Sequence, residues 1–303
     1  MEPQHTIRTL VRCHGVGLHT GLPVSLTLHP APADSGVVFR VVPDGVEVPV
    51  GPKSLINGHY ATTIGTAGVQ IQTVEHLLAA VRGLGIDNLV VEIDAPELPA
   101  MDGSSAPFVS LLEAAGRVAQ TAPRRPLWVT ERIRVGDDAR WIQISPAAEL
   151  RISYTLDMDH PAVGVQVVSI VPTVQRFVEE VASARTYGFL KDVELMRQQG
   201  LALGGSLDNA VVVGEERVLN GSLRFQDEFV RHKILDVIGD LALLGRPVVG
   251  HVVGRNGGHA LNHRLVREIS ERHQRRWDAD LECATPGPGG QRDARQASRT
   301  ATL

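Results

Sequence analysis

Two segments of the chain repeat one order of features, and each is too apolar to remain in water. Residues 75–93 and 231–252 both carry a histidine near the start of an apolar helical stretch, then a glycine, then a Val-Val strand. Helices of this kind bury their apolar side against a sheet or another helix. The order predicts an α+β fold with two similarly built halves. Because helix–glycine–strand units are common, coincidence explains the order equally well.

The length favours the same division. The chain has 303 residues, about twice the length of an average domain. We expect a first α+β domain over residues 1–122 and a second over 127–280, joined by the short Pro-containing segment TAPRRP. Residues 281–303 are rich in Pro, Gly, Ser and Arg, and we expect them to form a disordered tail.

Hydrophobic periodicity places the elements along the chain. Period-two alternation and β-branched runs predict strands, within 5–50 and at 88–93, 127–135, 140–146, 150–158 and 247–254. The three strands from 127 to 158 suggest a meander. Apolar stripes at helical spacing predict helices, at 73–83, 108–120, 173–184, 227–245 and 259–277. Thr73 is a candidate N-cap of the first helix.

Composition excludes several classes of protein. Two cysteines, Cys13 and Cys283, rule out a disulfide scaffold and a Cys-rich zinc finger, so any metal must take His and carboxylate ligands. A net charge of -4 argues against a nucleic-acid binder. No apolar run reaches the ~20 residues of a membrane span, and the N-terminus lacks a signal-peptide core. We expect a soluble, cytoplasmic protein.

One predicted helix carries a polar ladder. His232, Asp236 and Asp240 follow one another at i, i+4 spacing, so they share one helix face. An imidazole and a carboxylate one turn apart suit two ligands of one Zn²⁺. The same spacing is also typical of a solvent-exposed helix face that carries one His and two acids. Spacing alone favours this second interpretation.

Three further segments hold candidate chemistry. Glu75 and His76 point about 100° apart on a helix, so one could bind a metal and the other act on a neighbouring water. A surface Glu beside a half-buried His is the simpler interpretation. His259 follows two glycines at a helix start, which suits a proton shuttle or an incidental cap. ARTYGFLKD (184–192) places two aromatic residues where they wall a cleft or fill a core.

These segments together resemble one family. The order GVGLHTG (15–21), TVEH (73–76), ARTYGF (184–189), LGGSLDNAVVV (203–213), HKILDVIGD (232–240) and GGHALNH (257–263) closely resembles the zinc-dependent UDP-3-O-acyl-N-acetylglucosamine deacetylases of lipid A biosynthesis. The resemblance covers about residues 5–275. The TVEH and HKxLDxxGD blocks together are highly specific. Residues 57–69 fit only loosely, and Tyr187 stands where many members carry Phe.

The resemblance implies an architecture. The fold would consist of two layered α/β-sandwich domains, each with a small insert, and the active site would lie between them. In the second domain a βαβ-like insert at about 189–216 would form an apolar passage for the acyl chain of the substrate. Its lining would include Val193, Leu201, Ala202, Ala210 and Val212.

The resemblance also implies the roles of the polar residues. The family's ligands of one zinc ion match His76, His232 and Asp236. Glu75 matches the general base and His259 the general acid or the cation that stabilises the oxyanion. Asp240 would orient His259, and Thr186 would donate a hydroxyl to the oxyanion.

Five further residues match contacts to the substrate. His19 would lie near the nucleotide phosphates and Lys233 near the diphosphate or sugar, as the resemblance implies. Tyr187, Phe189 and Asp192 would surround the glucosamine and the mouth of the passage.

The expected activity is therefore the hydrolysis of an acetamide. The enzyme, a zinc metalloamidase, would release acetate from UDP-3-O-acyl-N-acetylglucosamine, an early committed step of lipid A (lipopolysaccharide) biosynthesis, and would act as a cytoplasmic monomer without nucleic-acid partners. Two alternatives are a zinc amidohydrolase for another N-acyl amino sugar and a non-catalytic sugar-nucleotide-binding relative. A purely structural zinc site usually has four protein ligands, and three candidates favour an open position.

Overall fold

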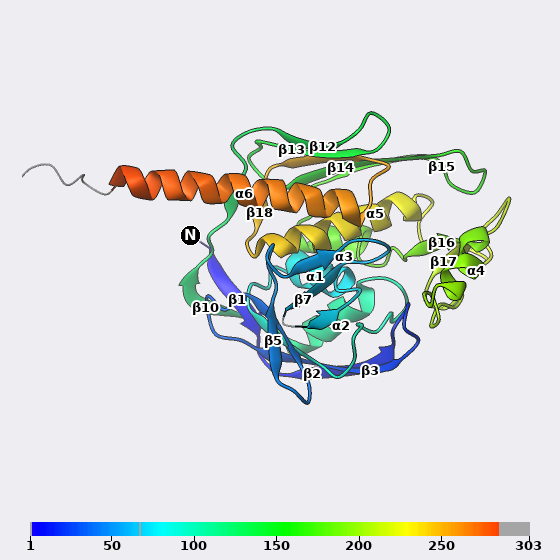
Figure 1. The fold of residues 1–303 in the computed structure, drawn as a ribbon, viewed down its shortest axis with the longest axis horizontal. Coiled ribbons are helices and arrows are strands. Elements are labelled where there is room, and N and C mark those ends of the chain that lie inside the picture. Colours follow the sequence, from blue (N-terminus) through cyan, green and yellow to red (C-terminus); the bar gives the residue numbers. More distant parts are fainter. Residues whose placement is uncertain (1, 67, 285–303) are drawn as a thin grey trace, which may run out of the picture.

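The computed structural model describes residues 2–66 and 68–284. Two five-stranded sheets enclose a layer of helices, giving a mixed α/β molecule (Figure 1). The fold class is thus consistent with the expected α+β arrangement. Within the described residues, no helix combines the length and the apolar character that a bilayer-spanning segment needs.

The first sheet has the strand order β2-β3-β9-β4-β5. Only the β9–β4 pair is parallel, and the other neighbours are antiparallel. Side chains alternate between core and surface, with Val24, Leu26 and Leu28 pointing inward from β3. The strands span Val11–Val16 (β2), Pro23–Pro30 (β3), Val37–Val41 (β4), Val46–Pro49 (β5) and Leu89–Ile93 (β9).

The second sheet repeats this topology. Its order is β12-β13-β19-β14-β15, again with one parallel pair, β19–β14, at the same position. In each sheet the last strand in sequence is the central one, and it follows an apolar helix. The strands span Ile133–Gly136 (β12), Trp141–Ser145 (β13), Arg151–Met158 (β14), Gly164–Ile170 (β15) and His251–Arg255 (β19).

Helices α1 and α5 pack directly against each other between the two sheets, whereas α4 lies to one side with β16 and β17 (Figure 1). Gly239 makes this contact possible, because a Cβ there would lie 2.2 Å from the Glu75 carbonyl oxygen. The α-helices span Glu75–Gly83 (α1), Ala106–Ala115 (α2), Val174–Glu180 (α3), Leu190–Gln198 (α4), Glu228–Leu241 (α5) and His259–Ala284 (α6), and a 3-10 turn covers Ala242–Leu244 (η1).

Smaller units complete the fold. The antiparallel pair β1–β10 and the parallel pair β11–β18 lie outside the large sheets, and β6, β7 and β8 form a three-stranded sheet. The parallel strands β16 and β17, connected through α4, form a βαβ unit. These strands span Pro3–Ile7 (β1), Leu55–Asn57 (β6), Thr63–Thr66 (β7), Val69–Ile71 (β8), Arg117–Pro123 (β10), Leu127–Trp128 (β11), Tyr187–Phe189 (β16), Val211–Val213 (β17) and Val248–Val249 (β18).

Four predicted elements differ from the structure because tertiary pairing overrides local pattern. The strand predicted at 127–135 divides into β11 and β12, which belong to different sheets. The helix predicted at 108–120 ends at Ala115, since Gly116 has φ 71° and residues 117–123, including part of the predicted linker, form β10 with β1. The strand predicted at 247–254 divides at Gly250 into β18 and β19, which belong to different sheets. The predicted meander is wrong in part, because β14 pairs with β15 and β19 rather than β13.

Two predicted ends also differ. The Thr73 side chain does not cap α1; its hydroxyl donates to Glu97 Oε1 at 2.9 Å. The last helix continues to Ala284, so residues 281–284 belong to α6 rather than to the predicted tail. Residues 285–303, which make up most of that tail, lie outside the described residues.

Candidate active site

The start of α1 and the GVGLHTG loop are held by one buried carboxylate. Glu97, 1% exposed, accepts hydrogen bonds from the backbone N–H groups of His19 and Thr20 and from the hydroxyls of Thr20 and Thr73. Thr73 has φ 58°, a left-handed conformation that turns the chain into α1. This network places His19 at the same cavity as Glu75 and His76.

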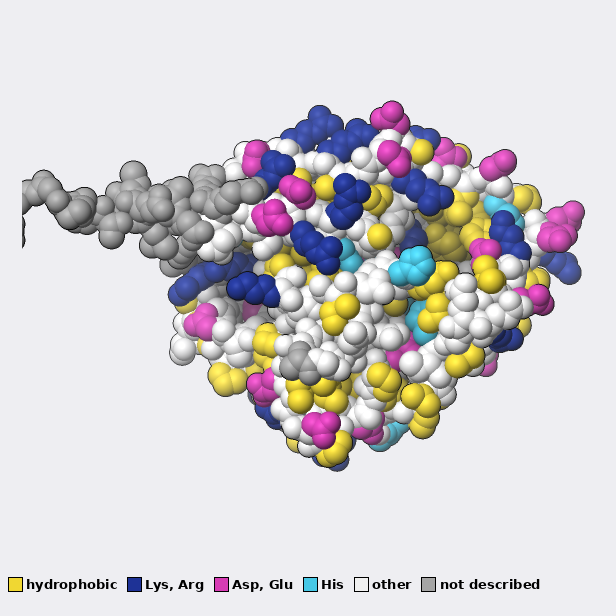
Figure 2. Space-filling view, viewed as in Figure 1, with side chains coloured by type: hydrophobic (Ala, Val, Ile, Leu, Met, Phe, Trp, Pro, Cys, Tyr) yellow, Lys and Arg dark blue, Asp and Glu magenta, His cyan; other side chains and the backbone are white. Residues whose placement is uncertain are grey.

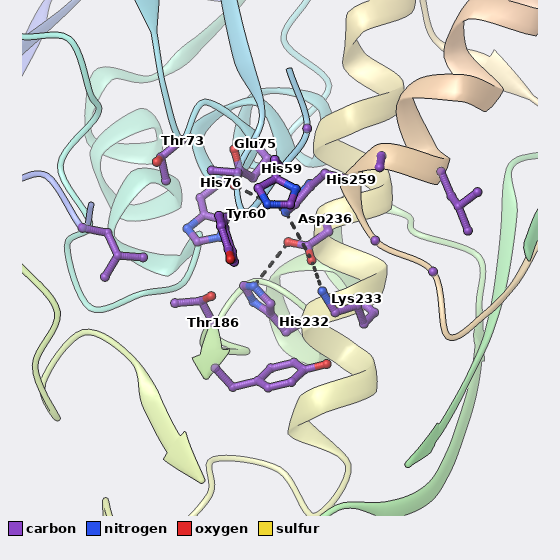
Figure 3. A pocket seen from close by; sticks show the side chains of 18 of the residues that line it. His59, Tyr60, Thr73, Glu75, His76, Thr186, His232, Lys233, Asp236 and His259 are labelled. Atoms are coloured by element: carbon purple, nitrogen blue, oxygen red, sulfur yellow. Dashed lines mark hydrogen bonds and ion pairs between the residues drawn. The ribbon is translucent and has the colours of Figure 1, made fainter. Parts of the chain in front are cut away.

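Two helices bring together the three predicted metal ligands (Figure 3). His76 comes from α1, and His232 and Asp236 from α5; one ligand atom of each lies within 4.8 Å of the other two. The His232 Nδ1–H donates to the Ala184 carbonyl at 3.0 Å, which directs Nε2 toward Asp236 Oδ1 at 3.2 Å. All three side chains are buried, so the exposed helix face that spacing alone favours is wrong.

The protonation states of this set suit a cation. Burial, aided by His232, lowers the pKa of His76 to about 3, and burial also lowers the pKa of His232, so both rings are neutral. Burial alone would raise the pKa of Asp236, but His232 and Lys233 outweigh it and hold that pKa below its usual range. Asp236 Oδ1 is buried and has no hydrogen-bond partner among the described residues. Two neutral imidazoles and a carboxylate with a free oxygen fit a divalent metal ion.

Glu75 lies beside this set with a raised pKa. Its Oε2 accepts the Thr62 backbone N–H at 3.0 Å, and its Oε1 lies 3.6 Å from His259 Nε2. Burial raises the pKa of Glu75 to about 7, with His259 opposing and Asp240 and Asp236 adding to the rise. A carboxyl group whose pKa lies near neutral pH can both accept and return a proton.

His259 begins α6 and faces Glu75 from the opposite side. Its Nδ1 donates to Asp240 Oδ2 at 2.9 Å, which leaves Nε2 toward the cavity. Burial alone would lower the pKa of His259, yet Asp240, Asp236 and Glu75 raise it to about 10. The imidazolium is therefore the form at neutral pH, and it offers a donor and a positive charge to the cavity.

Three residues of this network escape the sequence analysis. The Thr62 hydroxyl, fully buried, lies 2.5 Å from Asp240 Oδ1 and 2.9 Å from His263 Nε2, and Asn262 donates to Asp240 Oδ2 at 2.8 Å. His263 lies i+4 from His259, a spacing that could have revealed it. Thr62 belongs to the loosely matching stretch 57–69 and carries no local pattern. His59 and Tyr60 of that stretch also line the catalytic cavity.

The βαβ unit β16–α4–β17 lines an apolar cavity of about 540 Å³ that adjoins the catalytic one. His19, Tyr60, Thr186 and Tyr187 line both. Of the residues predicted for the passage and its mouth, the structure places most on this lining, namely Phe189, Asp192, Val193, Ala202, Ala210 and Val212. Leu201 is the exception and lies outside the lining. In Figure 2, histidine side chains gather right of the centre, next to hydrophobic ones.

Lys233 and Thr186 lie on opposite sides of the ligand set (Figure 3). Lys233 Nζ donates to Asp236 Oδ2 at 2.9 Å and lies 5.4 Å from the centre of the Tyr187 ring. Burial would lower the pKa of Lys233, but Asp236 raises it above its usual range, so the ammonium stays charged. The Thr186 backbone N–H donates to the Gly103 carbonyl, which ties this loop to the first half of the chain.

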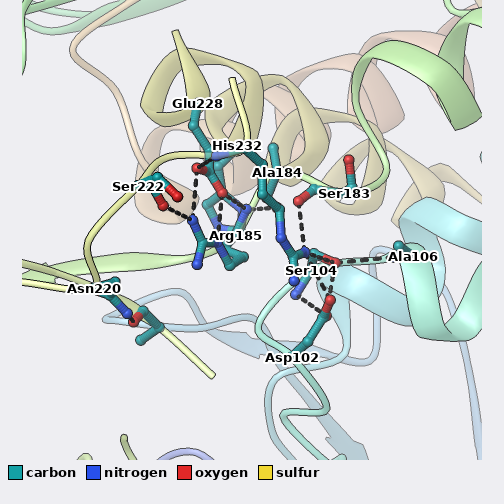
Figure 4. A network of polar contacts seen from close by, with 12 residues as sticks. Asp102, Ser104, Ala106, Ser183, Ala184, Arg185, Asn220, Ser222, Glu228 and His232 are labelled. Carbon is teal, nitrogen blue, oxygen red and sulfur yellow. Dashed lines mark hydrogen bonds and ion pairs between the residues drawn. The ribbon is translucent and has the colours of Figure 1, made fainter. Parts of the chain in front are cut away.

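A second buried carboxylate holds the loop that carries Thr186 (Figure 4). Glu228, 0% exposed, accepts two hydrogen bonds from the Arg185 guanidinium, at 2.8 and 3.0 Å, and one from its backbone N–H. Arg224 continues the network, donating its backbone N–H to Glu228 and its guanidinium to Asp102. The network fixes the Ala184 carbonyl that orients His232.

Comparison with known proteins identifies the family of this chain. The LpxC family, described as UDP-3-O-acyl N-acetylglycosamine deacetylase, matches residues 4–271. The chain belongs to this family. Its relatives include proteins named UDP-3-O-acyl-N-acetylglucosamine deacetylase from Oleidesulfovibrio alaskensis, 49% identical over 89% of this chain and 90% of the relative, and from Myxococcus xanthus, 48% identical over 88% and 86%. One from Acidithiobacillus ferrooxidans is 45% identical over 92% and 93%.

Proposed function

We propose that the chain hydrolyses the acetamide of UDP-3-O-acyl-N-acetylglucosamine, releasing acetate in lipid A biosynthesis. One observation supports this most directly: the His76–His232–Asp236 set lies beside Glu75 and His259, at the mouth of an apolar cavity. A relative that only bound the sugar nucleotide would need neither a perturbed carboxylate nor a buried imidazolium. The family membership and the names of the relatives support the same activity.

We propose one Zn²⁺ per chain, held by His76, His232 and Asp236. When bound, the ion supplies Lewis acidity and a water molecule of lowered pKa. Glu75 would take the proton of the attacking water, because its raised pKa matches neutral operation. His259, protonated and held by Asp240, would stabilise the oxyanion and donate a proton to the leaving amine. The Thr186 hydroxyl would be a second donor to the oxyanion.

The apolar cavity supports the lipid part of the substrate. An acyl chain fits a cavity of about 540 Å³ whose walls come from Val193, Ala202, Ala210 and Val212, whereas a small soluble amino sugar needs no such space. Tyr187, Phe189 and Asp192 would surround the glucosamine at its mouth. His19 and Lys233 would contact the nucleotide phosphates and the diphosphate or sugar, respectively.

We further propose two layered domains, 1–122 and 127–280, with the active site between them. The shared strand order of the two five-stranded sheets supports this division, since each half then supplies one sheet and part of the helix layer. The βαβ unit at about 189–216 would be the insert of the second domain. We also propose a cytoplasmic monomer, and size-exclusion chromatography with light scattering tests the oligomeric state.

An acetate-release assay tests the function. UDP-linked substrates with 3-O-acyl chains of graded length should be hydrolysed with a clear length optimum, and a chelator should abolish turnover until Zn²⁺ is restored. Activity on N-acetylglucosamine derivatives that lack the acyl chain, at an equal rate, would instead support the amidohydrolase for another amino sugar. Binding without turnover in the zinc-loaded protein would contradict the proposal.

A further inference from the structure

A separate cavity, of about 270 Å³, lies at the opposite end of α1 from Glu75 and His76. Arg82, in the last turn of α1, lines it, and about 10 Å of helix rise separates its backbone from that of Glu75. Arg124 and Arg246 also line it, together with apolar residues such as Ile238 and Leu241 of α5. This cavity shares no lining residue with the catalytic one.

Positive charge is in excess around this cavity. Arg124 Nε lies 2.9 Å from Asp87 Oδ2, and Arg82 Nη1 lies 3.8 Å from Asp87 Oδ1, so two guanidinium groups share one carboxylate. The other acid paired with Arg124 is Glu2, whose side chain is 80% exposed and therefore screened by water. Arg246 adds a third cation. Within the described residues, Arg246 forms no ion pair.

Two of the donors have no partner. The Arg82 side chain is only 13% exposed, and its Nε is buried and makes no hydrogen bond within the described residues. Burial lowers the pKa of Arg82 to about 10, with Asp87 opposing and Arg124 adding to the fall, so the group stays charged at neutral pH. Arg246 is half-buried and makes no hydrogen bond to any described residue. Asp87 is shared between Arg82 and Arg124, so the cavity keeps an excess of positive charge that an anion would balance.

Capping of α1 accounts for part of the cluster. Arg117 Nη1 donates to the Leu84 carbonyl at 2.8 Å and Arg124 Nη2 to the Gly85 carbonyl at 2.7 Å, and both carbonyls lie just beyond the C-terminal end of α1. Cations at this end also favour the helix dipole. These contacts leave Arg82 Nε and Arg246 unexplained.

We propose that this cavity binds a small organic oxyanion. Its phosphate or carboxylate group would lie between Arg82 and Arg246, and its apolar part would pack on Ile238 and Leu241. Guanidinium groups prefer such planar or tetrahedral oxyanions because they bind them through paired N–H donors. The ligand would connect the end of α1 with the segment that follows α5 and η1. This site does not depend on the proposed function.

Isothermal titration calorimetry on the full chain tests the site, with phenyl phosphate as the probe. Saturating UDP in the cell would compete for phosphate contacts in the catalytic cavity, so binding that persists reports the cavity at the end of α1. Arg246→Gln should weaken binding about tenfold, because one charge-assisted contact is lost. Arg125→Gln, which removes an exposed arginine next to Arg124, is the matched control and should bind like the parent.

The probe series separates the chemical classes. If benzoate binds as tightly as phenyl phosphate, the site accepts carboxylates. If the apolar wall contributes to binding, inorganic phosphate should bind more weakly than phenyl phosphate. Arg82→Gln should also weaken binding. If Arg82→Gln does not fold, Arg246→Gln still tests the site. The proposal is overturned by displacement with UDP, by equal losses in Arg246→Gln and Arg125→Gln, or by no binding of either probe at about 10 mM, a weak-affinity limit.

Discussion

At the scale of single residues, the site depends on opposite pKa shifts in two neighbours. Glu75 and His259 lie 3.6 Å apart; burial raises the pKa of the first to about 7, and three carboxylates raise that of the second to about 10. Between these values the base is ionised and the acid is protonated. Pairs of titratable groups whose environments separate their pKa values mark acid and base roles.

A pH profile follows from these two groups. Activity should rise with pH as Glu75 loses its proton and fall as His259 loses its own, giving a bell-shaped kcat/KM. A bound divalent cation lowers both pKa values, so the limbs should lie below about 7 and about 10. His259→Ala should lose the basic limb, as measured from acetate release between pH 5 and 10. A basic limb that persists unchanged would assign it to another group.

The role of Glu75 has a separate test. Glu75→Gln keeps the shape of the side chain and removes its basicity, so turnover should fall by about 100-fold or more while the zinc content stays at one per chain. Elemental analysis of the purified variant checks the metal. Near-normal turnover would exclude Glu75 as the base, and loss of metal would assign it a structural role.

Thr62 should position Asp240 and His259 without touching the substrate. Thr62→Val keeps the shape but removes the hydroxyl that contacts Asp240 and His263, and we expect kcat to fall about tenfold with KM unchanged. Thr62→Ser retains a hydroxyl and should recover most of the rate. If Thr62→Val kept its activity and Thr62→Ser lost it, the methyl packing rather than the hydrogen bond would matter.

At the scale of elements, the candidate active site depends on the contact between helices α1 and α5. The HKILDVIGD segment supplies two of the proposed ligands and Asp240, but only its contact with α1 adds His76 and Glu75. Gly239 permits that contact, since any side chain there would meet the Glu75 backbone. The glycine therefore controls the distance between Glu75 and the acids of α5.

Gly239→Ala should damage both stability and activity. A Cβ 2.2 Å from the Glu75 carbonyl oxygen forces the helices apart, at a cost of about 1–3 kcal/mol in the free energy of unfolding. Urea denaturation and acetate release measure the two effects. Gly51→Ala is the control, because a Cβ at Gly51 meets no atom within 4 Å. Equal behaviour of the two variants would contradict a role for the contact between α1 and α5.

At the scale of the whole molecule, two sheets of the same topology enclose helices that bring together proposed metal ligands from both halves of the chain. His76 follows the small β6–β8 sheet and precedes the central strand of the first large sheet, whereas His232 and Asp236 precede the central strand of the second. A metal ion bound by all three would therefore hold the two halves together.

Metal binding should stabilise the fold as a whole. Zn²⁺ at about 100 times its Kd adds about 2.7 kcal/mol, which corresponds to a rise in Tm of roughly 5 °C over the metal-free protein. Differential scanning calorimetry measures the shift, and His232→Ala should abolish it. His14→Ala removes an exposed histidine of β2 and should leave the shift intact. A shift of equal size in His232→Ala would place the metal elsewhere.

The sequence by itself determined the helices and strands with strong periodicity, and its motifs identified the family and predicted the residues proposed for the chemistry. These follow from local pattern: His232, Asp236 and Asp240 are one helical turn apart whatever surrounds them. From spacing alone their burial was not evident, because the same ladder suits a solvated face.

Only the tertiary structure decided what those residues face. Contacts between distant segments produce four features that local pattern does not show. These are the division of 247–254 between two sheets, the strand at 117–123, the place of Thr62 beside Asp240 and the arginine cluster around Asp87. The physical reason is that pairing, burial and pKa depend on neighbours in space, whereas periodicity reports only neighbours along the chain.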